Sequence, residues 1–510
     1  MAGPAGLSTF AQLMTIRLPV THAGTGGGHG GRMPGTVEER RHLLVSAAAE
    51  GATVMVRRFA AMVLCGGLLA AGCSTGDDSP VPAPRSLPPQ SRSAAPAGQA
   101  DWTTYHRDGL RSGYAPGTPA LGTLRPAWTA RLDGAVYGQP LVVRGKVVAA
   151  TENDTVYALA PDTGRVLWHR HLGTPQPRSG LGCGNIDPLG ITGTPVYDPS
   201  TGLVFAVAET AGGRHRLVGL DLATGREKVG REVEPPAGDR LAHQQRAALA
   251  LLAGRVYIAY GGLYGDCGSY RGSVVSVPVT GSGPVASYTV PTHRMGGIWA
   301  PGGPVVDGGR LLVPVGNGES TGGSYDGTDS VLALTAGLHR TDYFAPSVWG
   351  RDNAVDADLG SLTPVRIGRF VLIVGKRGTA YLLAADHLGG IGGQLAQTDA
   401  CPAYGAAAFT GSTVYVPCSD GLLQLTVRAD GTMTTGWRTE LRRAGSPVIG
   451  GGAVWVTDFE AGTLYALDPD TGRVRQHQAV GDLPNFASPV LSGDHVYLGT
   501  RTGVSALSGA

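Results

Sequence analysis

One phrase recurs along this chain and limits the folds that it can adopt. In each copy a small residue and proline open a short apolar strand, a turn and a Val-Tyr pair follow, and an Ala-Leu-Asp segment ends in Thr-Gly. The clearest copies begin at Gly138 and Gly445, and units near Ala248 and Ala407 lack the proline. The openings fall near residues 140, 195, 248, 304, 364, 407, 447 and 489, which predicts eight units of a repeat architecture.

The units have the pattern of strands rather than helices. Short runs of Val, Leu, Ile and Tyr alternate with Gly, Asp-Gly or Thr-Gly turns. No unit could bury both faces alone, whereas radial stacking buries the faces between neighbours. We therefore predict an all-β fold, an eight-bladed β-propeller over residues 101–510. The last unit ends near Val504 without an outer strand, so we expect an N-terminal strand around Trp128 to complete that blade, beside the strand around Val496, and to close the ring.

Composition and charge narrow the range of partners. Glycine accounts for 81 residues and proline for 35, as a chain with many turns requires, and only 16% of residues are charged. The formal net charge is +2, and lysine and arginine are scattered along the chain. Such a chain has no field that would concentrate nucleic acid, and we expect no nucleic-acid partner.

The N-terminal region has the pattern of a secretion signal. In residues 55–72, Arg57 and Arg58 precede an apolar stretch too short to span a bilayer, and the segment ends in Leu-Leu-Ala-Ala-Gly before Cys73. This ending resembles the lipobox of bacterial lipoproteins, which implies that Cys73 carries the lipid, including palmitate, and anchors the protein to the membrane outside the cytoplasm. A signal peptide cleaved near Ala71 is the alternative. Residues 1–54 are interpreted as a non-native or disordered extension, and residues 73–100, rich in Ser, Pro and Ala, as a disordered tether.

Four cysteines remain in the body of the chain, and an even number in a secreted protein predicts disulfides, for which three pairings are possible. Cys401 and Cys418 flank a single hairpin and are expected to pair. By elimination, Cys183 then pairs with Cys267. Metal binding is the alternative, and the absence of a Cys-x-x-Cys motif or a nearby histidine pair disfavours it.

The Asp-Thr-Gly turn at residues 162–164, followed by Trp168, resembles the repeat of the pyrroloquinoline quinone (PQQ)-like propellers. That family includes quinoprotein dehydrogenases and the outer-membrane assembly lipoprotein BamB, and the resemblance covers residues 101–510. In the dehydrogenases PQQ and calcium lie on the propeller axis. The resemblance implies candidates for each role: calcium ligands Glu209 and Asn317, a stacking indole at Trp299, a quinone contact at Lys376, and a base at Asp329, with Asp326 competing for that role.

Each of these residues also has a structural interpretation, as a turn or packing residue. The dehydrogenases commonly carry two adjacent cysteines over the quinone, and this sequence has no Cys-Cys pair. We therefore favour a monomeric, non-catalytic binding or scaffold protein at the cell envelope, without a cofactor, whose partner is an envelope protein or a small ligand. The alternative is a PQQ- and calcium-dependent dehydrogenase that oxidises an alcohol or sugar. A hydrolase using the cluster Asp352, Asp356 and Asp358 is a third hypothesis, which a missing Gly-x-Ser-x-Gly elbow weakens.

Overall fold

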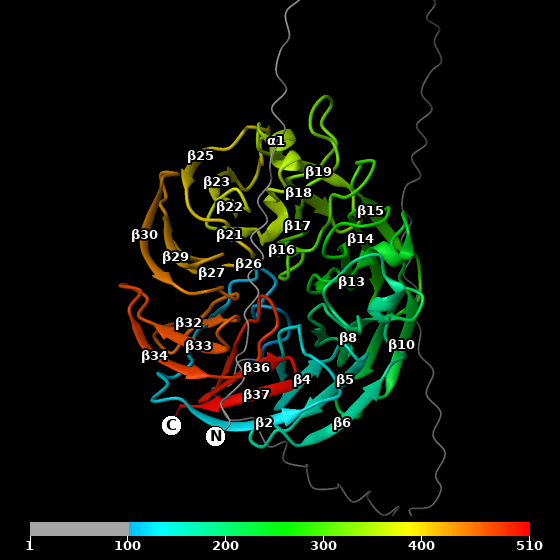
Figure 1. Ribbon diagram of the computed structural model, residues 1–510, viewed down its shortest axis with the longest axis vertical. Coiled ribbons are helices and arrows are strands. Elements are labelled where there is room, and N and C mark those ends of the chain that lie inside the picture. The colour runs from blue at the N-terminus through cyan, green and yellow to red at the C-terminus, as the bar shows by residue number, and fades with distance from the viewer. Residues whose placement is uncertain (1–100, 510) are drawn as a thin grey trace, which may run out of the picture. The chain divides into compact units, whose positions relative to one another are not determined.

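The computed structural model describes residues 101–509, which form eight antiparallel blades, each built on four strands (Figure 1). Blades 1 to 4 comprise β3 (Leu141–Val143), β4 (Lys146–Ala150), β5 (Thr155–Leu159) and β6 (Val166–His171); β7 (Val196–Asp198), β8 (Leu203–Thr210), β9 (Arg214–Asp221) and β10 (Glu227–Glu232); β12 (Ala250–Leu252), β13 (Arg255–Gly262), β14 (Ser273–Pro278) and β15 (Ala286–Thr289); and β16 (Val305–Asp307), β17 (Arg310–Val315), β18 (Ser330–Thr335) and β19 (Arg340–Ala345).

Blades 5 to 8 comprise β21 (Val365–Ile367), β22 (Phe370–Val374), β23 (Thr379–Ala384) and β25 (Ala396–Asp399); β27 (Ala408–Thr410), β28 (Thr413–Cys418), β29 (Gly421–Val427) and β30 (Met433–Glu440); β31 (Val448–Gly450), β32 (Ala453–Asp458), β33 (Thr463–Leu467) and β34 (Val474–Ala479); and β35 (Val490–Ser492), β36 (His495–Thr500), β37 (Gly503–Ser508) and β2 (Arg125–Arg131). Each blade's first strand begins one or two residues after the opening predicted from the repeat. The predicted blade number is therefore confirmed, including the two units that lack proline.

The last blade is closed by the N-terminal strand, as predicted. β2 pairs antiparallel with β37, and Trp128 lies opposite Ala506 (Figure 1, cyan beside red). The direct neighbour is thus β37, and β36, which contains Val496, lies on the far side of β37. Strands from both ends of the described chain share one sheet, so the ring has no free outer edge at its junction.

A segment that the sequence analysis did not foresee occupies the middle of the ring. Residues 102–115, called the hub segment below, run through its centre (Figure 1, blue). First strands of five blades bond to its backbone: Trp102 N–H donates to Val142 O, Tyr197 N–H to Thr103 O, Val306 N–H to Gly109 O, Phe409 N–H to Ser112 O and Ile449 N–H to Gly113 O, at 2.7–2.9 Å. At its end, β1 (Tyr114–Ala115) pairs parallel with β31.

Arg111 is the most deeply buried cation of the hub segment, with 2% of its surface exposed. Its guanidinium donates to the backbone oxygens of Leu249 at 2.9 Å and Pro304 at 3.2 Å, which belong to blades 3 and 4. It also donates to Tyr105 O at 3.2 Å and, by a short bond, to Thr104 Oγ1. A planar, five-donor group is suited to joining carbonyls from several strands at one point.

The Trp and Thr-Gly elements of the repeat meet between neighbouring blades. The Trp168 indole of blade 1 donates from Nε1 to Leu222 O of blade 2 at 3.0 Å, and its ring covers Gly225. Trp128 and Trp437 make the same pair of contacts with Pro161 O and Gly164, and with Pro469 O and Gly472. All three glycines have positive φ, between 66° and 71°. The repeat motif thus encodes an interlock between blades, in which the turn must be glycine to admit the indole.

We expect Gly225→Ala to lower the free energy of unfolding by about 2–4 kcal/mol, because the new Cβ would meet Trp168 atoms 2.6 Å away in a left-handed backbone. Gly202→Ala is the matched control: its φ is +72°, and a Cβ there has nothing within 4 Å. Chemical denaturation of both variants separates the clash from the backbone strain. Equal destabilisation of the two variants would show that the indole does not require glycine.

Both predicted disulfides are present. Cys183 pairs with Cys267 and Cys401 with Cys418, with Cα separations of 5.9 and 5.6 Å. These bonds fit an extracytoplasmic location. The predictions for residues 1–54, 55–72 and 73–100, including the lipidation of Cys73, lie outside the described residues. Within residues 101–509, no helix has the length and apolarity to cross a membrane.

Candidate functional site

A cavity of about 380 Å³ lies at the mouth of the ring, where the loops that enter the first strands converge. Seven of the eight blades contribute such loop residues, so the cavity lies on the ring axis: Tyr137, Asn185, Arg246, Trp299, Asp358, Tyr404 and Phe486. Asn317 and Lys376, which lie just after the second strands of their blades, also line the cavity. Its volume is within the range of sites for small ligands. We call it the axial cavity.

The structure brings three of the five candidate residues into the axial cavity. Trp299, Asn317 and Lys376 all line it, together with Asp356 and Asp358, which the sequence analysis had assigned to a hydrolase hypothesis. Lys376 Nζ lies 2.7 Å from Asp356 Oδ1, 2.7 Å from Asp358 Oδ2 and 5.9 Å from the Trp299 ring centroid. Asn317 N–H donates to the other Asp358 oxygen by a short bond.

These contacts neutralise the charged groups of the cavity. Burial alone would lower the pKa of Lys376, but Asp358 and Asp356 outweigh it and raise that pKa above its ordinary value. Burial raises the pKa of Asp358, while Lys376 and the Asn317 N–H oppose the rise. Lys376 is therefore held as a cation between two carboxylates, and its ammonium has few donors left for a ligand.

Asp329, the candidate base, lies outside the lining of the axial cavity. None of its surface is exposed, and its Oδ1 accepts a hydrogen bond from Leu359 N–H at 2.9 Å. Oδ2 has no hydrogen-bond partner. Burial, with the Asp358 charge adding to it, raises the pKa of Asp329 well above its ordinary value. Its competitor Asp326 accepts hydrogen bonds from Thr292 and Thr328. Neither Asp329 nor Asp326 lines the cavity, whereas Asp356 and Asp358 do.

Glu209 also lies outside the lining, in a buried acidic cluster with Glu152 and Asp154. Its Oε2 is 3.4 Å from His215 Nε2, and Glu234 lies 3.4 Å from the other ring nitrogen. Burial raises the pKa of Glu152 to about 7 and that of Asp154 to about 9. His215 has a pKa raised to about 9, because the two glutamates outweigh its burial. Neither oxygen of Asp154 has a hydrogen-bond partner.

The three carboxylates of the hydrolase hypothesis serve as ion-pair partners. Asp352 binds Arg377, and Asp356 and Asp358 share Lys376. Asp352 lies in the short helix α1 (Trp349–Ala354) and is buried. Each of the three side chains is thus paired with a cation.

Apart from Trp299, the aromatic residues of the cavity, above all Phe486, were not predicted from the sequence. Its ring centroid lies 6.2 Å from Trp299, 6.2 Å from Tyr404 and 5.9 Å from Phe459, and the Arg246 guanidinium carbon lies 5.5 Å above it. Its φ is +65°, which is rare for a bulky residue. Such backbone conformations cluster at ligand sites. The only local signal was an isolated phenylalanine in a loop entering a strand.

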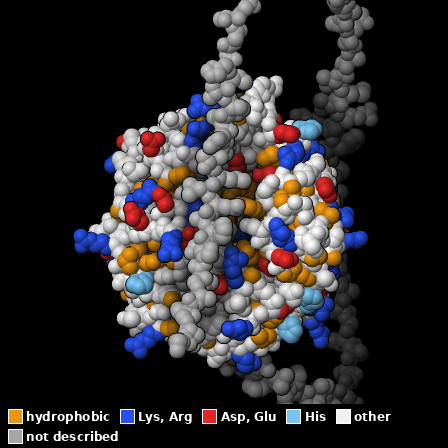
Figure 2. All heavy atoms as spheres, in the orientation of Figure 1, with side chains coloured by type: hydrophobic (Ala, Val, Ile, Leu, Met, Phe, Trp, Pro, Cys, Tyr) orange, Lys and Arg blue, Asp and Glu red, His pale blue; other side chains and the backbone are white. Residues whose placement is uncertain are grey.

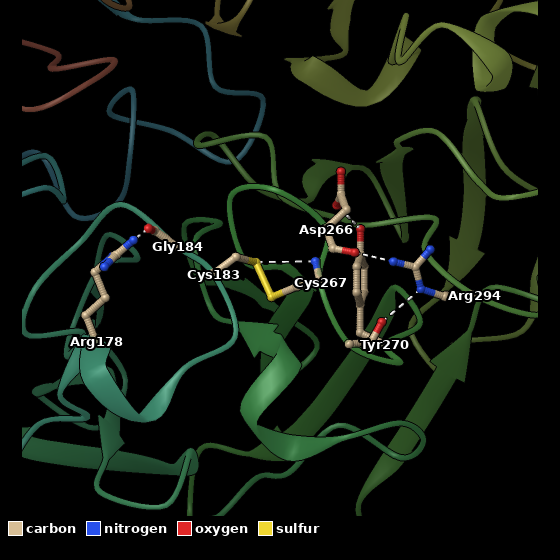
Figure 3. The surroundings of a disulfide bond; sticks show 8 residues. Arg178, Cys183, Gly184, Asp266, Cys267, Tyr270 and Arg294 are labelled. Carbon is tan, nitrogen blue, oxygen red and sulfur yellow. Dashed lines mark hydrogen bonds between the residues drawn. A yellow bond between two sulfur atoms is a disulfide. The ribbon is translucent and has the colours of Figure 1, made fainter.

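The Cys183–Cys267 disulfide joins two loops that contribute to the cavity wall (Figure 3). Asn185 follows one cysteine and Asp266 precedes the other, and both line the cavity. Cys267 N–H donates to Cys183 Sγ at 3.3 Å, and Tyr270 donates from its hydroxyl to Asp266 Oδ1 at 2.5 Å. The disulfide therefore fixes the wall of the cavity through loops far apart in sequence, and not through adjacent cysteines.

The residues of the cavity match the dehydrogenase pattern for quinone and calcium only in part. A flat indole, an amide and a carboxylate line the cavity, but Glu209 is turned to His215 and Lys376 occupies the carboxylates. Among residues 101–509, no group of three or more His, Cys, Asp or Glu side chains is arranged to hold a metal ion. The residues therefore suit a flat ligand but do not complete a calcium site.

An eight-bladed ring of Trp-interlocked repeats with an axial cavity defines the chain as a PQQ-like propeller. The family model described as outer membrane protein assembly factor BamB matches residues 120–319 and 419–510, more than half of the chain, and the chain belongs to this family. No curated protein matches the sequence.

Solved structures share the fold at low sequence identity. A quinohemoprotein alcohol dehydrogenase from Pseudomonas putida is 16% identical over 80% of each chain, with a TM-score of 0.64. The corresponding enzyme from Comamonas testosteroni is 17% identical over 81% of this chain and 80% of its own, with a TM-score of 0.64. BamB from Moraxella catarrhalis is 16% identical over 76% of this chain and 100% of its own, with a TM-score of 0.54. These similarities extend to the fold alone.

Proposed function

We propose that this protein is a lipid-anchored, extracytoplasmic binding protein that holds a small ligand in the axial cavity without transforming it. The observation that carries the proposal is the double pairing of Lys376 with Asp356 and Asp358 at 2.7 Å each. Charged groups that could transfer protons are bound to one another, whereas the aromatic rings of Trp299 and Phe486 line the cavity. Rigid aromatic walls with a few polar groups are typical of binding pockets.

The competing function is a PQQ- and calcium-dependent dehydrogenase; two of the structural neighbours are quinohemoprotein alcohol dehydrogenases. One observation favours it: Trp299, Asn317 and Lys376 line a single cavity. In such an enzyme the quinone would supply the oxidising power, and Asp358 would be a buried carboxylate of the cavity wall that could act beside it. The buried positions of Glu209 and Asp329 favour the binding protein instead. BamB, which gives the family model its name, supports a role in which the propeller binds partners.

One experiment separates the two functions. The purified full chain is incubated with PQQ and calcium chloride, binding is followed by calorimetry, and dye reduction is measured with primary alcohols and aldoses. We expect no dye reduction above the rate of free PQQ. Robust dye reduction that Asp358→Asn abolishes, and that the control Asp326→Asn retains, would establish the dehydrogenase.

The lipid anchor is tested separately by Cys73→Ser. Because a thiol at this position is the acylation site in the lipobox interpretation, the variant should pass from the membrane fraction to the soluble envelope fraction or the medium. Cys65→Ser, within the same signal segment, is the matched control and should leave the fractionation unchanged. Unchanged membrane partitioning of Cys73→Ser would contradict lipid anchoring through this residue.

A further inference from the structure

A groove of about 760 Å³ adjoins the axial cavity over blades 6, 7 and 8. The cavity and the groove share four lining residues: Tyr264, Tyr404, Asn485 and Phe486. These residues form the boundary through which one space passes into the other. The groove is further lined by Phe459, Arg443, Glu460 and Arg501. Cavity and groove are together called the trough. Its combined volume exceeds that of most sites for a single small molecule, which leaves room for a ligand of more than one unit.

Aromatic side chains are distributed along the whole trough. Trp299 lies in the cavity, Tyr404 and Phe486 at the boundary and Phe459 in the groove, with Phe486 in contact with the other three. Tyr264 is 72% exposed, although it lies at the boundary and belongs to a loop next to the Cys183–Cys267 disulfide. An exposed tyrosine at this position offers a ring face to a ligand. Together these rings form one aromatic surface across the boundary, against which flat or ring-shaped units can stack.

The charges of the trough select among chain-like ligands. Arg443 Nε is 3.1 Å from Glu460, and Lys376 is paired as described, so these cations do not offer a continuous positive track for a polyanion. Figure 2 shows the same interspersion of acidic and basic side chains on the face that it presents. Neutral hydrogen-bonding groups, such as the amides of Asn485, Gln244 and Asn185, remain. Amides beside aromatic faces match the hydroxyls and apolar ring faces of sugars.

Arg246 and Arg501 are the exceptions in this balance, since among the described residues neither forms an ion pair with a carboxylate. Arg501 lines the groove and donates to the Tyr137 hydroxyl at 2.9 Å. Arg246 lines the axial cavity, and its guanidinium carbon lies 5.6 Å from the Tyr137 centroid and 5.5 Å from that of Phe486. It donates to Asn485 O at 3.1 Å, and Glu152 attracts it only at longer range. Its planar fork suits bidentate binding of a carboxylate in the axial cavity.

We propose that the trough binds an acidic oligosaccharide, with a carboxylate-bearing sugar in the axial cavity and further sugars stacked along the groove. A peptide is less suited, because the groove is lined mainly by loop and turn residues, with only the strand ends Cys418 and Ala479 among them, and so presents little strand edge for main-chain pairing. This proposal rests on the proposed binding function, and it adds the ligand class and the second half of the site.

The test compares one sugar unit with three. Calorimetry is performed on the full chain with galacturonate, with the α-1,4 trimer of galacturonate, with the β-1,4 trimer of mannuronate, and with uncharged maltotriose. At least one acidic trimer should bind ten or more times more tightly than galacturonate, and more tightly than maltotriose. Arg246→Gln should weaken the acidic ligands about tenfold and leave maltotriose unchanged.

Two variants test the groove. Phe459→Ala removes a ring that lines only the groove and should weaken the trimer about tenfold while leaving galacturonate binding unchanged. Tyr264→Ala removes an exposed ring at the boundary and should weaken the trimer more than galacturonate, whereas Trp299→Ala should weaken both ligands. Equal affinities for monomer and trimer, with no effect of Tyr264→Ala, would overturn the trough but leave an axial site. Tighter binding of an acidic aromatic tripeptide than of either trimer would overturn the sugar assignment. Absence of binding by all of these ligands would overturn both the sugar assignment and its axial carboxylate subsite. The fractionation of Cys73→Ser and the dye-reduction assay test the proposed function independently of that result.

Discussion

Arg111→Ala should lower the free energy of unfolding by about 3–5 kcal/mol, an unusually large loss for one side chain. The substitution removes the donors that satisfy Leu249 O, Pro304 O and Tyr105 O, and these oxygens are buried with the guanidinium. Carbonyls left without partners in the interior carry the full desolvation penalty. Urea denaturation followed by tryptophan fluorescence measures the change.

Arg107→Ala is the matched control within the hub segment. Both arginines have positive φ, +76° at Arg107 and +61° at Arg111, so alanine meets the same backbone strain at either position. Arg107 is partly exposed and donates one long bond, 3.4 Å, to Tyr114 O. A loss at Arg111 no larger than that at Arg107 would contradict the role of the buried guanidinium in joining the blades.

Asp154→Asn should raise the free energy of unfolding at pH 8 by on the order of 3–5 kcal/mol. Burial raises the pKa of Asp154 from 3.8 to about 9, with Glu152 and Glu209 adding to the shift. Asparagine removes the ionisation, tolerates the φ of +53°, and brings an amide donor to a cluster in which Glu152 Oε1 and Glu209 Oε1 have no partner. Denaturation at pH 8 measures the gain, and a destabilised variant would contradict it.

The pH dependence of stability provides the control for Asp154. Because its folded pKa is raised, the folded state binds the proton more tightly, and this contribution is complete below pH 3.8 and is lost as pH rises through about 9. Glu152, raised from 4.5 to about 7, and His215, raised from 6.5 to about 9, act with the same sign. Wild-type stability should therefore fall between pH 5 and 9, more steeply than that of Asp154→Asn, and the two proteins should converge near pH 4.

The fold was predictable because its determinants are local and repeated. The turn that places Gly225 under Trp168 recurs with the same residues around Gly472 and Trp437, so the period and the blade count could be read from the sequence. The hub segment could not be foreseen, since its hydrogen bonds go to strands from five blades and impose no period on its own residues. Arg111 has no sequence neighbour that indicates its distant carbonyl partners.

The candidate site was predictable in part for a related reason. Trp299, Asn317 and Lys376 come together because each lies where a loop enters or leaves a strand at the same end of the ring. Glu209 also lies near the end of a second strand, but its side chain is paired with His215 instead of lining the cavity. No local sequence pattern indicates this orientation. Asp329 and Asp358 look alike in sequence, and only packing decides that one is enclosed and the other faces the cavity.

The position of the hub segment determines how a ligand can come and go. The cavity is walled by residues that precede the first strands, whereas the hub segment bonds to residues within those strands, such as Val142, Tyr197 and Val306. The hub segment thus occupies the ring axis at the level of the first strands, beyond the cavity, and closes the axis on that side. A ligand must leave by the mouth through which it entered, and a polymer can be held by one end but cannot be threaded through the ring. Such a geometry favours recognition of chain termini over passage along a chain.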